Sequence, residues 1–231
     1  MNQPVHTAYA RLSAAAKAAG LACRGGFHPQ DGDDVPVLDG LTARTVVLLG
    51  FTGREQWPVF AASPEYGDGA PHPLDRWSQR VVGGLARQFG GRALHPFTGP
   101  PWWPFQRWAQ RAERLYASPL GVLMHAEYGL WHAYRGALLL PDVIEVPSLQ
   151  GWSSPCESCR ERPCLGACPV GALSGGHFMP AACHAHVVSP NGASCRTRGC
   201  LARYACPVAE RHRYDAAQAT FHLHAFIAAR G

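Results

Sequence analysis

Eight of the nine cysteines in this chain lie between Cys156 and Cys206. A first run has the spacing Cys-x2-Cys-x4-Cys-x3-Cys-Pro, and a second has the spacing Cys-x4-Cys-x5-Cys-Pro. Cys183 lies between the two runs. Thiols crowded in this way either pair as disulfides or bind soft metals as thiolates. Metal binding and disulfide formation are therefore the two chemistries that the spacing offers.

A proline follows the last cysteine of each run, as Pro169 and Pro207. The Cys-Pro ending is typical of ferredoxin-type [4Fe–4S] ligation, in which the last cysteine of one run binds the other cluster. Proline also suits the first position of a helix, where its missing N–H is no loss. We therefore expect two [4Fe–4S] clusters and an electron-transfer function.

The crossing of ligands divides the eight cysteines between two sites of four. We expect the first cluster on Cys156, Cys159, Cys164 and Cys206. We expect the second cluster on Cys168, Cys183, Cys195 and Cys200. This assignment uses all eight clustered thiols, because each of the two clusters takes four ligands.

Three other interpretations of the cysteines stay open. Two zinc sites with four thiolates each would also use Cys-x2-Cys elements, although zinc ribbons do not require Cys-Pro endings. Disulfides suit secreted proteins, whereas residues 1–20 lack the apolar segment and cleavage site of a secretory signal. The third interpretation is a single cluster with four thiols left unused. It stays open because the second run departs from the compact ferredoxin spacing.

Composition sets limits on the class of protein. The chain has 231 residues, of which 47% are hydrophobic and 16% charged, and a net charge of +5. The sequence has no concentrated stripe of basic residues, so we expect no nucleic-acid partner. It also has no run of about 18 apolar residues, so we expect no membrane partner. We expect a cytoplasmic protein, in which the isolated Cys23 is an ordinary thiol.

The order of segments predicts an α+β fold. We expect a small α/β core over residues 1–147, which binds a cofactor or partner. A loop-rich dicluster ferredoxin-like module follows over residues 148–214, and a C-terminal helix over residues 215–231 docks on the core. The cysteine region has little apolar content, so its metal centres must supply much of its stability.

The apolar patterns predict individual elements. Helices are expected over residues 5–20, 75–91 and 106–116, strands over 45–50 and 93–97, and loops over 57–73 and 99–105. Residues 128–146 predict a loop that leads into two short strands or one bent strand. Pro141 would mark the bend, because proline cannot donate to a sheet ladder.

Two groups of aromatic and histidine residues could line a cofactor site. The first group consists of His95 and the aromatic residues Trp102, Trp103, Phe105 and Trp108. The second group lies between His125 and Tyr134 and includes Trp131. We expect His95, Trp102, His125 and Trp131 to contact a cofactor, with a packed loop as the alternative for the first group.

Arginines lie among the expected cluster ligands. Positive charge near a cluster raises its reduction potential and attracts an acidic donor. An ordinary solvated side chain also explains each of them. They are Arg160, Arg162, Arg196, Arg198 and Arg203.

Residues 76–207 resemble the epoxyqueuosine reductase family of cobalamin-dependent iron–sulfur enzymes and its relatives, the reductive dehalogenases. The resemblance rests on Tyr128-Gly129-Leu130-Trp131, on residues 137–140, on the cysteine runs and on the Cys168 to Cys183 interval. It implies a corrinoid as the electron acceptor in the N-terminal core. We expect a ferredoxin or flavodoxin as the electron donor.

The catalytic aspartate of that family is matched here by residues 95–99, which contain no acid. The catalytic residue is therefore unknown, and the resemblance leaves open whether the chain is an oxidoreductase. A ferredoxin-type electron carrier or accessory subunit, without a substrate site of its own, is the alternative.

Overall fold

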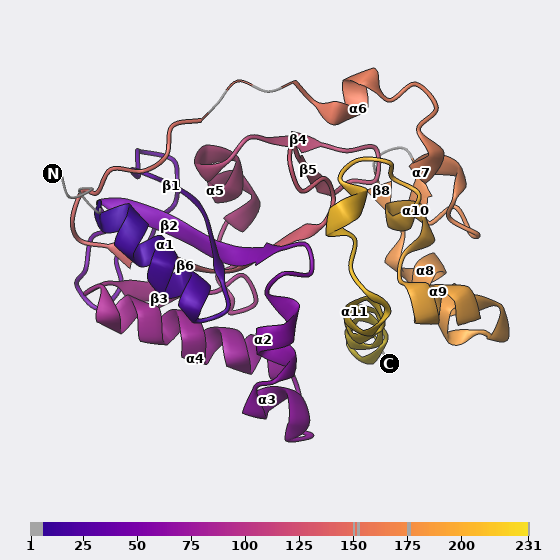
Figure 1. Ribbon diagram of the computed structural model, residues 1–231, viewed down its shortest axis with the longest axis horizontal. Coiled ribbons are helices and arrows are strands. Elements are labelled where there is room, and N and C mark those ends of the chain that lie inside the picture. The colour runs from indigo at the N-terminus through magenta and orange to yellow at the C-terminus, as the bar shows by residue number, and fades with distance from the viewer. Residues whose placement is uncertain (1–6, 150, 152, 175–176, 231) are drawn as a thin grey trace, which may run out of the picture. The chain divides into compact units, whose positions relative to one another are not determined.

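The computed structural model describes residues 7–149, 151, 153–174 and 177–230. The chain divides into two compact units (Figure 1). The first unit comprises Met1–Arg114 and Ala133–Gly151, and the second comprises Leu115–His132 and Trp152–Gly231. Each unit has its own core. Among the described residues, no helix has the length and apolar composition needed to cross a membrane.

The first unit is built on a four-stranded sheet with the strand order β1-β2-β6-β3. Strand β1 pairs antiparallel with β2, and β3 pairs antiparallel with β6. Every residue of β2 is buried, which explains its continuous apolar and β-branched sequence. The strands are β1 (Ala22–Phe27), β2 (Thr45–Thr52), β3 (Arg92–Leu94) and β6 (His132–Leu140).

Helices cover this sheet. Helices α1 and α4 contact each other, and α5 packs against β1 and β2 (Figure 1). The hydroxyl of Thr7 accepts a hydrogen bond from the Ala10 N–H at 3.2 Å and so caps the start of α1. The helices are α1 (Ala8–Ala18), α2 (Trp57–Ala61), α3 (Pro64–Gly67), α4 (Pro73–Gln88) and α5 (Phe105–Ala112).

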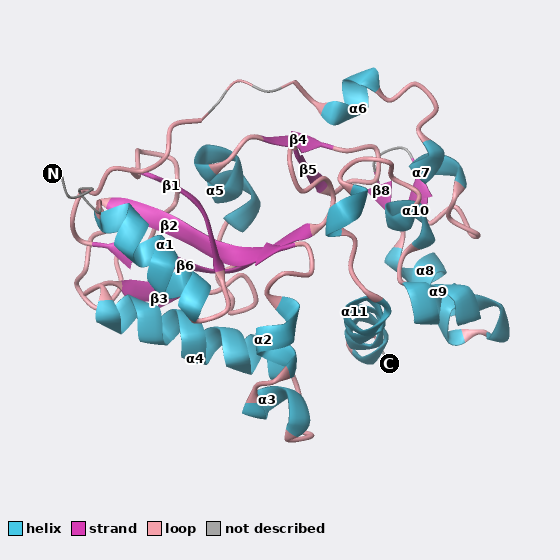
Figure 2. Cartoon of the chain, viewed as in Figure 1, coloured by secondary structure: helices cyan, strands magenta, loops and turns pink. Residues whose placement is uncertain are grey.

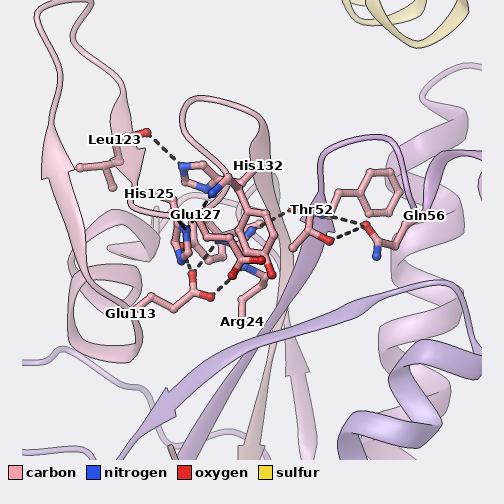
Figure 3. Close-up of polar contacts among 11 residues, drawn as sticks. Arg24, Thr52, Gln56, Glu113, Leu123, His125, Glu127 and His132 are labelled. Carbon is pink, nitrogen blue, oxygen red and sulfur yellow. Dashed lines mark hydrogen bonds and ion pairs between the residues drawn. The ribbon is translucent and has the colours of Figure 1, made fainter. Parts of the chain in front are cut away.

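A buried ion pair ties α5 to the sheet of the first unit (Figure 3). Arg24 on β1 is fully buried and donates two hydrogen bonds to the carboxylate of Glu113, which follows α5. Its Nη1 donates to the Phe51 carbonyl oxygen at 2.8 Å. The hydroxyl of Tyr134 donates to the same carboxylate at 2.7 Å. The Phe51 carbonyl and the Tyr134 hydroxyl thus offset part of the free-energy cost of burying the charges of Arg24 and Glu113.

The second unit consists of short elements joined by loops (Figure 2). Strand β4 pairs antiparallel with β5, β7 pairs antiparallel with β8, and α11 packs against α8 and α9. Its helices are α6 (Pro155–Ser158), α7 (Pro163–Gly166), α8 (Pro180–Val188), α9 (Ala193–Arg198), α10 (Leu201–Tyr204) and α11 (Ala216–Ala228), with 3-10 turns η1 (Pro190–Gly192) and η2 (Glu210–His212). Its strands are β4 (Leu115–Ala117), β5 (Leu123–His125), β7 (Leu173–Ser174) and β8 (His177–Phe178).

The core of the second unit combines aliphatic side chains with thiols. Leu120, Met124 and Leu130 are buried together with Cys164 and Cys206. The segment of residues 115–132 thus supplies the apolar side chains that the cysteine region lacks. The domain boundaries that we expect after residues 147 and 214 remain predictions.

Helix α11 belongs to the second unit and packs against α8 and α9.

The mixed α+β architecture predicted from the sequence is confirmed, with corrections to single elements. Residues 57–73 were expected to form a loop, but they contain α2 and α3. Both helices begin with proline near their first position, which fits a helix start as well as a loop. Strand β1 was not expected, because its two glycines disfavour a strand.

Two further corrections concern the ends of elements. Helix α5 ends at Ala112, and residues 115–117 form β4 where the sequence predicts helix to residue 116. Residues 128–146 contain one strand, β6, which ends before Pro141. Residues 143–146 are described and form no strand, although their apolar, β-branched sequence suggested one.

Candidate metal centres

The structure gathers the eight clustered cysteines into two groups within the second unit. The first thiol group lines a small hollow of about 20 Å³ and consists of Cys156, Cys159, Cys164 and Cys206. The second thiol group lines a cavity of about 360 Å³ and consists of Cys168, Cys183, Cys195 and Cys200. These are the two sets of four that the crossed-ligand pattern predicts. Their role as ligands stays a prediction.

Short helices place the first thiol group. Ser154 is buried, and its hydroxyl accepts a hydrogen bond from the Cys156 N–H at 3.3 Å, which fixes the start of α6. Arg162 has a φ of 42° and turns the chain into α7, which carries Cys164. Each helix lasts one turn, so the sulfurs project from separate directions.

The second thiol group comes from more distant segments. The Cys168 sulfur accepts a hydrogen bond from the Ala172 N–H at 3.2 Å, while Cys183 lies on α8 and Cys195 on α9.

Gly199 joins α9 to Cys200 with a φ of 82°, a conformation that side chains disfavour. A Cβ there would also lie 3.1 Å from that of Ala219. Glycine is therefore required for this turn.

The thiols of each group influence one another electrostatically. Burial is the main cause that raises the pKa of Cys183 to about 11, and the thiols of Cys200, Cys168 and Cys195 add to it. Burial also raises the pKa of Cys206, with further contributions from thiols of the first group alone. The raised pKa values keep the thiols of Cys183 and Cys206 protonated at neutral pH, so a metal that binds them must displace these protons.

The donors of both groups are thiols in largely apolar surroundings. Each group offers four thiols around a hollow whose other lining side chains are mostly apolar. Among the described residues, no three Cys, His, Asp or Glu side chains converge closely enough to hold one metal ion. Four thiolates can hold either a zinc ion or a [4Fe–4S] cluster.

One arginine lies beside the second thiol group. Arg203 lines its cavity, and the guanidinium carbon lies 4.5 Å from the ring centres of both Trp131 and Tyr214. Its Nε donates to the Leu130 carbonyl oxygen at 3.0 Å, and Nη2 donates to the same oxygen. Sequence reasoning treated this arginine like its solvated neighbours. The two rings that hold it come from distant segments, which spacing cannot reveal.

The four residues expected to contact a cofactor divide between the units. His95 is buried in the first unit, with its Nδ1 3.3 Å from the Arg135 carbonyl oxygen, while Trp102 there is 67% exposed. In the second unit, Trp131 is buried, and His125 lies against Tyr128 with ring centres 4.7 Å apart. That these side chains line one pocket stays a prediction.

Backbone contacts determine the tautomer of His125. Its Nδ1 accepts a hydrogen bond from the N–H of Glu127 at 3.0 Å (Figure 3). The N–H of Tyr128 donates to the same nitrogen at 3.2 Å. A nitrogen that accepts carries no proton, so the neutral ring has its proton on Nε2. The Nε2 of His132 lies 3.0 Å from the Leu123 carbonyl oxygen and therefore also carries a proton.

Comparison with known proteins finds a distant structural likeness to epoxyqueuosine reductases. The structure of that enzyme with an epoxyqueuosine-modified tRNA-Tyr stem loop is 15% identical over 90% of this chain and 67% of that one, with a TM-score of 0.47. The enzyme from Streptococcus thermophilus is also 15% identical, over 88% and 66%, with a TM-score of 0.48. A selenomethionine-labelled epoxyqueuosine reductase is 14% identical over 91% and 68%, also at 0.48. No family model matches the chain. No curated protein matches it either.

Proposed function

We propose that this chain is a redox protein that carries two [4Fe–4S] clusters, one on each thiol group, and transfers electrons to an acceptor. The observation that carries the proposal is the separation of the eight thiols into two sets of four. Each set lines its own hollow and combines cysteines from both runs. Bound clusters would supply one-electron redox chemistry at each group.

The neighbourhood of the two groups supports transfer between them. Leu120 lines both hollows, so only a short stretch of protein separates them. Cys164 and Cys168 belong to one run but to different groups, which also limits the separation. Cys164 and Cys206 are buried, and Cys156 and Cys159 are partly buried. Electrons can therefore pass between neighbouring centres inside the second unit.

Serine substitutions test the assignment of ligands. The full chain is reconstituted anaerobically, and iron and acid-labile sulfide are counted. We expect about eight irons per chain in the wild type. Cys164→Ser and Cys183→Ser should each lose up to about four irons, from different clusters. Cys23→Ser is the matched control and should lose none, because Cys23 lies on β1 in the first unit.

Two outcomes would contradict the assignment. One is an iron content that stays at the wild-type level in both ligand variants. The other is a wild-type chain that binds no iron and takes up zinc. Circular dichroism of each variant shows whether iron loss reflects a missing ligand or an unfolded chain. A variant that keeps its helices but loses one cluster identifies the ligand directly.

We propose a corrinoid as the acceptor, because this is what the resemblance of residues 76–207 implies. Titration of the reconstituted chain with cob(II)alamin should change its visible spectrum. His95→Gln and Trp102→Ala should weaken this binding, whereas Cys23→Ser should not. An unchanged spectrum with no measurable binding to the wild type would remove the corrinoid and leave a plain electron carrier.

A further inference from the structure

One cysteine of the second thiol group reaches the protein surface. Cys200 is exposed, whereas the other seven clustered cysteines are buried or partly buried. An electron passes between two proteins most rapidly where the distance between their redox centres is shortest. Cys200 therefore marks the place on the second unit where an external redox partner comes nearest to a cluster on that group.

A small hollow with two arginines, the arginine hollow, lies beside Cys200. Its volume is about 130 Å³, and Arg198 and Arg203 line it together with Cys200 and the rings of Trp131 and Tyr214. Helix α11 supplies further lining residues, and Figure 1 shows it beside α9, which ends at Arg198. Of the second thiol group, only Cys200 lines the arginine hollow, so this hollow is distinct from the larger cavity that all four thiols line.

The positive charge of the two arginines has no carboxylate partner. Among the residues that the structure describes, neither Arg198 nor Arg203 forms an ion pair. Arg198 is exposed and Arg203 is half-buried. The guanidinium carbon of Arg203 lies 4.5 Å from the ring centres of both Trp131 and Tyr214, which restrict its rotation. A guanidinium held in this way binds an oxygen acceptor with little further loss of entropy.

The size of the arginine hollow limits what can enter it. Its 130 Å³ is well below the range of about 300–1,000 Å³ that is typical of sites for whole small molecules. The carboxylate group of a side chain is small enough to fit. Arginine binds carboxylates through charge-assisted hydrogen bonds, and surface arginines steer acidic partners towards a protein. Size and charge therefore both favour an aspartate or glutamate side chain of another protein.

We propose that the surface around Cys200 docks an acidic electron-donor protein, one of whose carboxylate side chains enters the arginine hollow. The donor is oxidised by one electron, and the second cluster is reduced by that electron. The inference rests on the proposed function, because it requires a cluster on the second thiol group. It adds the surface at which electrons enter and the charge of the partner.

Two small one-electron oxidants of opposite charge test this surface directly. The full chain is reconstituted anaerobically, reduced with dithionite, and mixed in a stopped-flow spectrometer with anionic Fe(III)–EDTA or cationic hexaammineruthenium(III). Fe(III)–EDTA carries carboxylates and a negative charge, as the proposed partner does. We expect Arg198→Glu to slow oxidation by Fe(III)–EDTA at least about threefold and not to slow oxidation by hexaammineruthenium(III).

Arg54→Glu is the matched control, because Arg54 is exposed in the first unit and the substitution changes the net charge equally. Both of its oxidation rates should stay near those of the wild type. A fall in the potential of the second cluster would speed both oxidants, so slower oxidation by the anion alone reports its approach. Arg198→Gln removes the charge without reversing it and should give a smaller effect in the same direction.

A second readout does not depend on electron transfer. Tris(oxalato)chromate(III) is an inert paramagnetic anion, and it should shorten the spin relaxation of one reduced cluster in electron paramagnetic resonance. Arg198→Glu should weaken this effect, whereas Arg54→Glu should preserve it.

Iron content, expected at about eight per chain, is counted in every sample. In iron-loaded chains, equal Fe(III)–EDTA rates for the wild type and Arg198→Glu, or equal slowing by Arg54→Glu, overturn the inference and leave the proposed function standing. Saturable inhibition by acetate at constant ionic strength would assign the arginine hollow to a free small carboxylate and also overturn the inference. A wild-type chain without iron overturns the proposed function, and the inference with it.

Discussion

Arg24 and Glu113 form a bidentate ion pair in the first unit, with Nε–Oε1 at 2.9 Å and Nη2–Oε2 at 2.7 Å. The arginine side chain is fully buried and the glutamate is 13% exposed. Removing one partner of a buried pair leaves an uncompensated charge, which costs about 3–5 kcal/mol. We therefore expect Glu113→Gln to lower the free energy of unfolding of the first unit by about this amount.

Urea denaturation followed by circular dichroism measures this loss. Asp39→Asn is the matched control, because Asp39 is 80% exposed in its ion pair with Arg92. Exposed pairs contribute about 1 kcal/mol or less. Equal small losses in both variants would show that Arg24 does not depend on Glu113.

Cys23 should resist alkylation in the folded chain. Burial raises the pKa of its thiol from 9.0 to about 12. The thiolate is the reactive form, so at pH 8 the reactive fraction falls about a thousandfold. Iodoacetamide labelling with mass spectrometry should find Cys23 unmodified in the native chain and modified in urea. Labelling at equal rates in both states would show that the folded chain does not protect this partly buried thiol.

His95 should make the first unit less stable in acid. Burial is the main cause that lowers its pKa below the usual 6.5. Above pH 6.5 the ring is neutral in both states. Below it, the unfolded chain binds a proton that the native chain does not, so the free energy of unfolding falls as the pH falls towards the native pKa.

Urea denaturation between pH 7.5 and pH 5 checks this effect. The stability of the wild type relative to His95→Gln should decrease over that interval. His72→Asn is the control, because His72 is exposed and its left-handed backbone conformation suits asparagine. If both substitutions change the pH profile equally, His95 is not responsible.

Arg203 should raise the reduction potential of the second cluster. Arg203 lines that cavity and is half-buried, so water screens its charge only in part. Arg203→Gln should lower the potential of one cluster and leave the other unchanged, because the added electron loses a neighbouring positive charge. Redox titration monitored by electron paramagnetic resonance measures both. Arg54→Gln, at an exposed position in the first unit, should shift neither.

The cysteine spacing, the Cys-Pro endings and the count of thiols predicted two sets of four, and the same two sets line the two hollows of the second unit. Their role as ligands stays a prediction. Ligand spacing is a local property, and the Cys-Pro endings indicate where a run crosses to the other site. Strand β2 and helix α4 were also predicted, because continuous burial and a 3.6-residue period leave a direct trace in sequence.

Features that depend on distant contacts could not be predicted. Strand β1 contains Gly25 and Gly26 and is a strand because β2 pairs with it. The Arg24–Glu113 pair joins residues 89 positions apart. The contribution of residues 115–132 to the core around the thiols was equally hidden, because Leu120 and Met124 lie in a short hairpin without a periodic pattern.

The most direct test of the central claim is a Mössbauer spectrum of the wild-type chain reconstituted anaerobically with 57Fe, together with its total metal content. The account predicts about eight irons per chain, all in [4Fe–4S] clusters. A colourless chain that holds zinc in its thiol groups and no iron would contradict it.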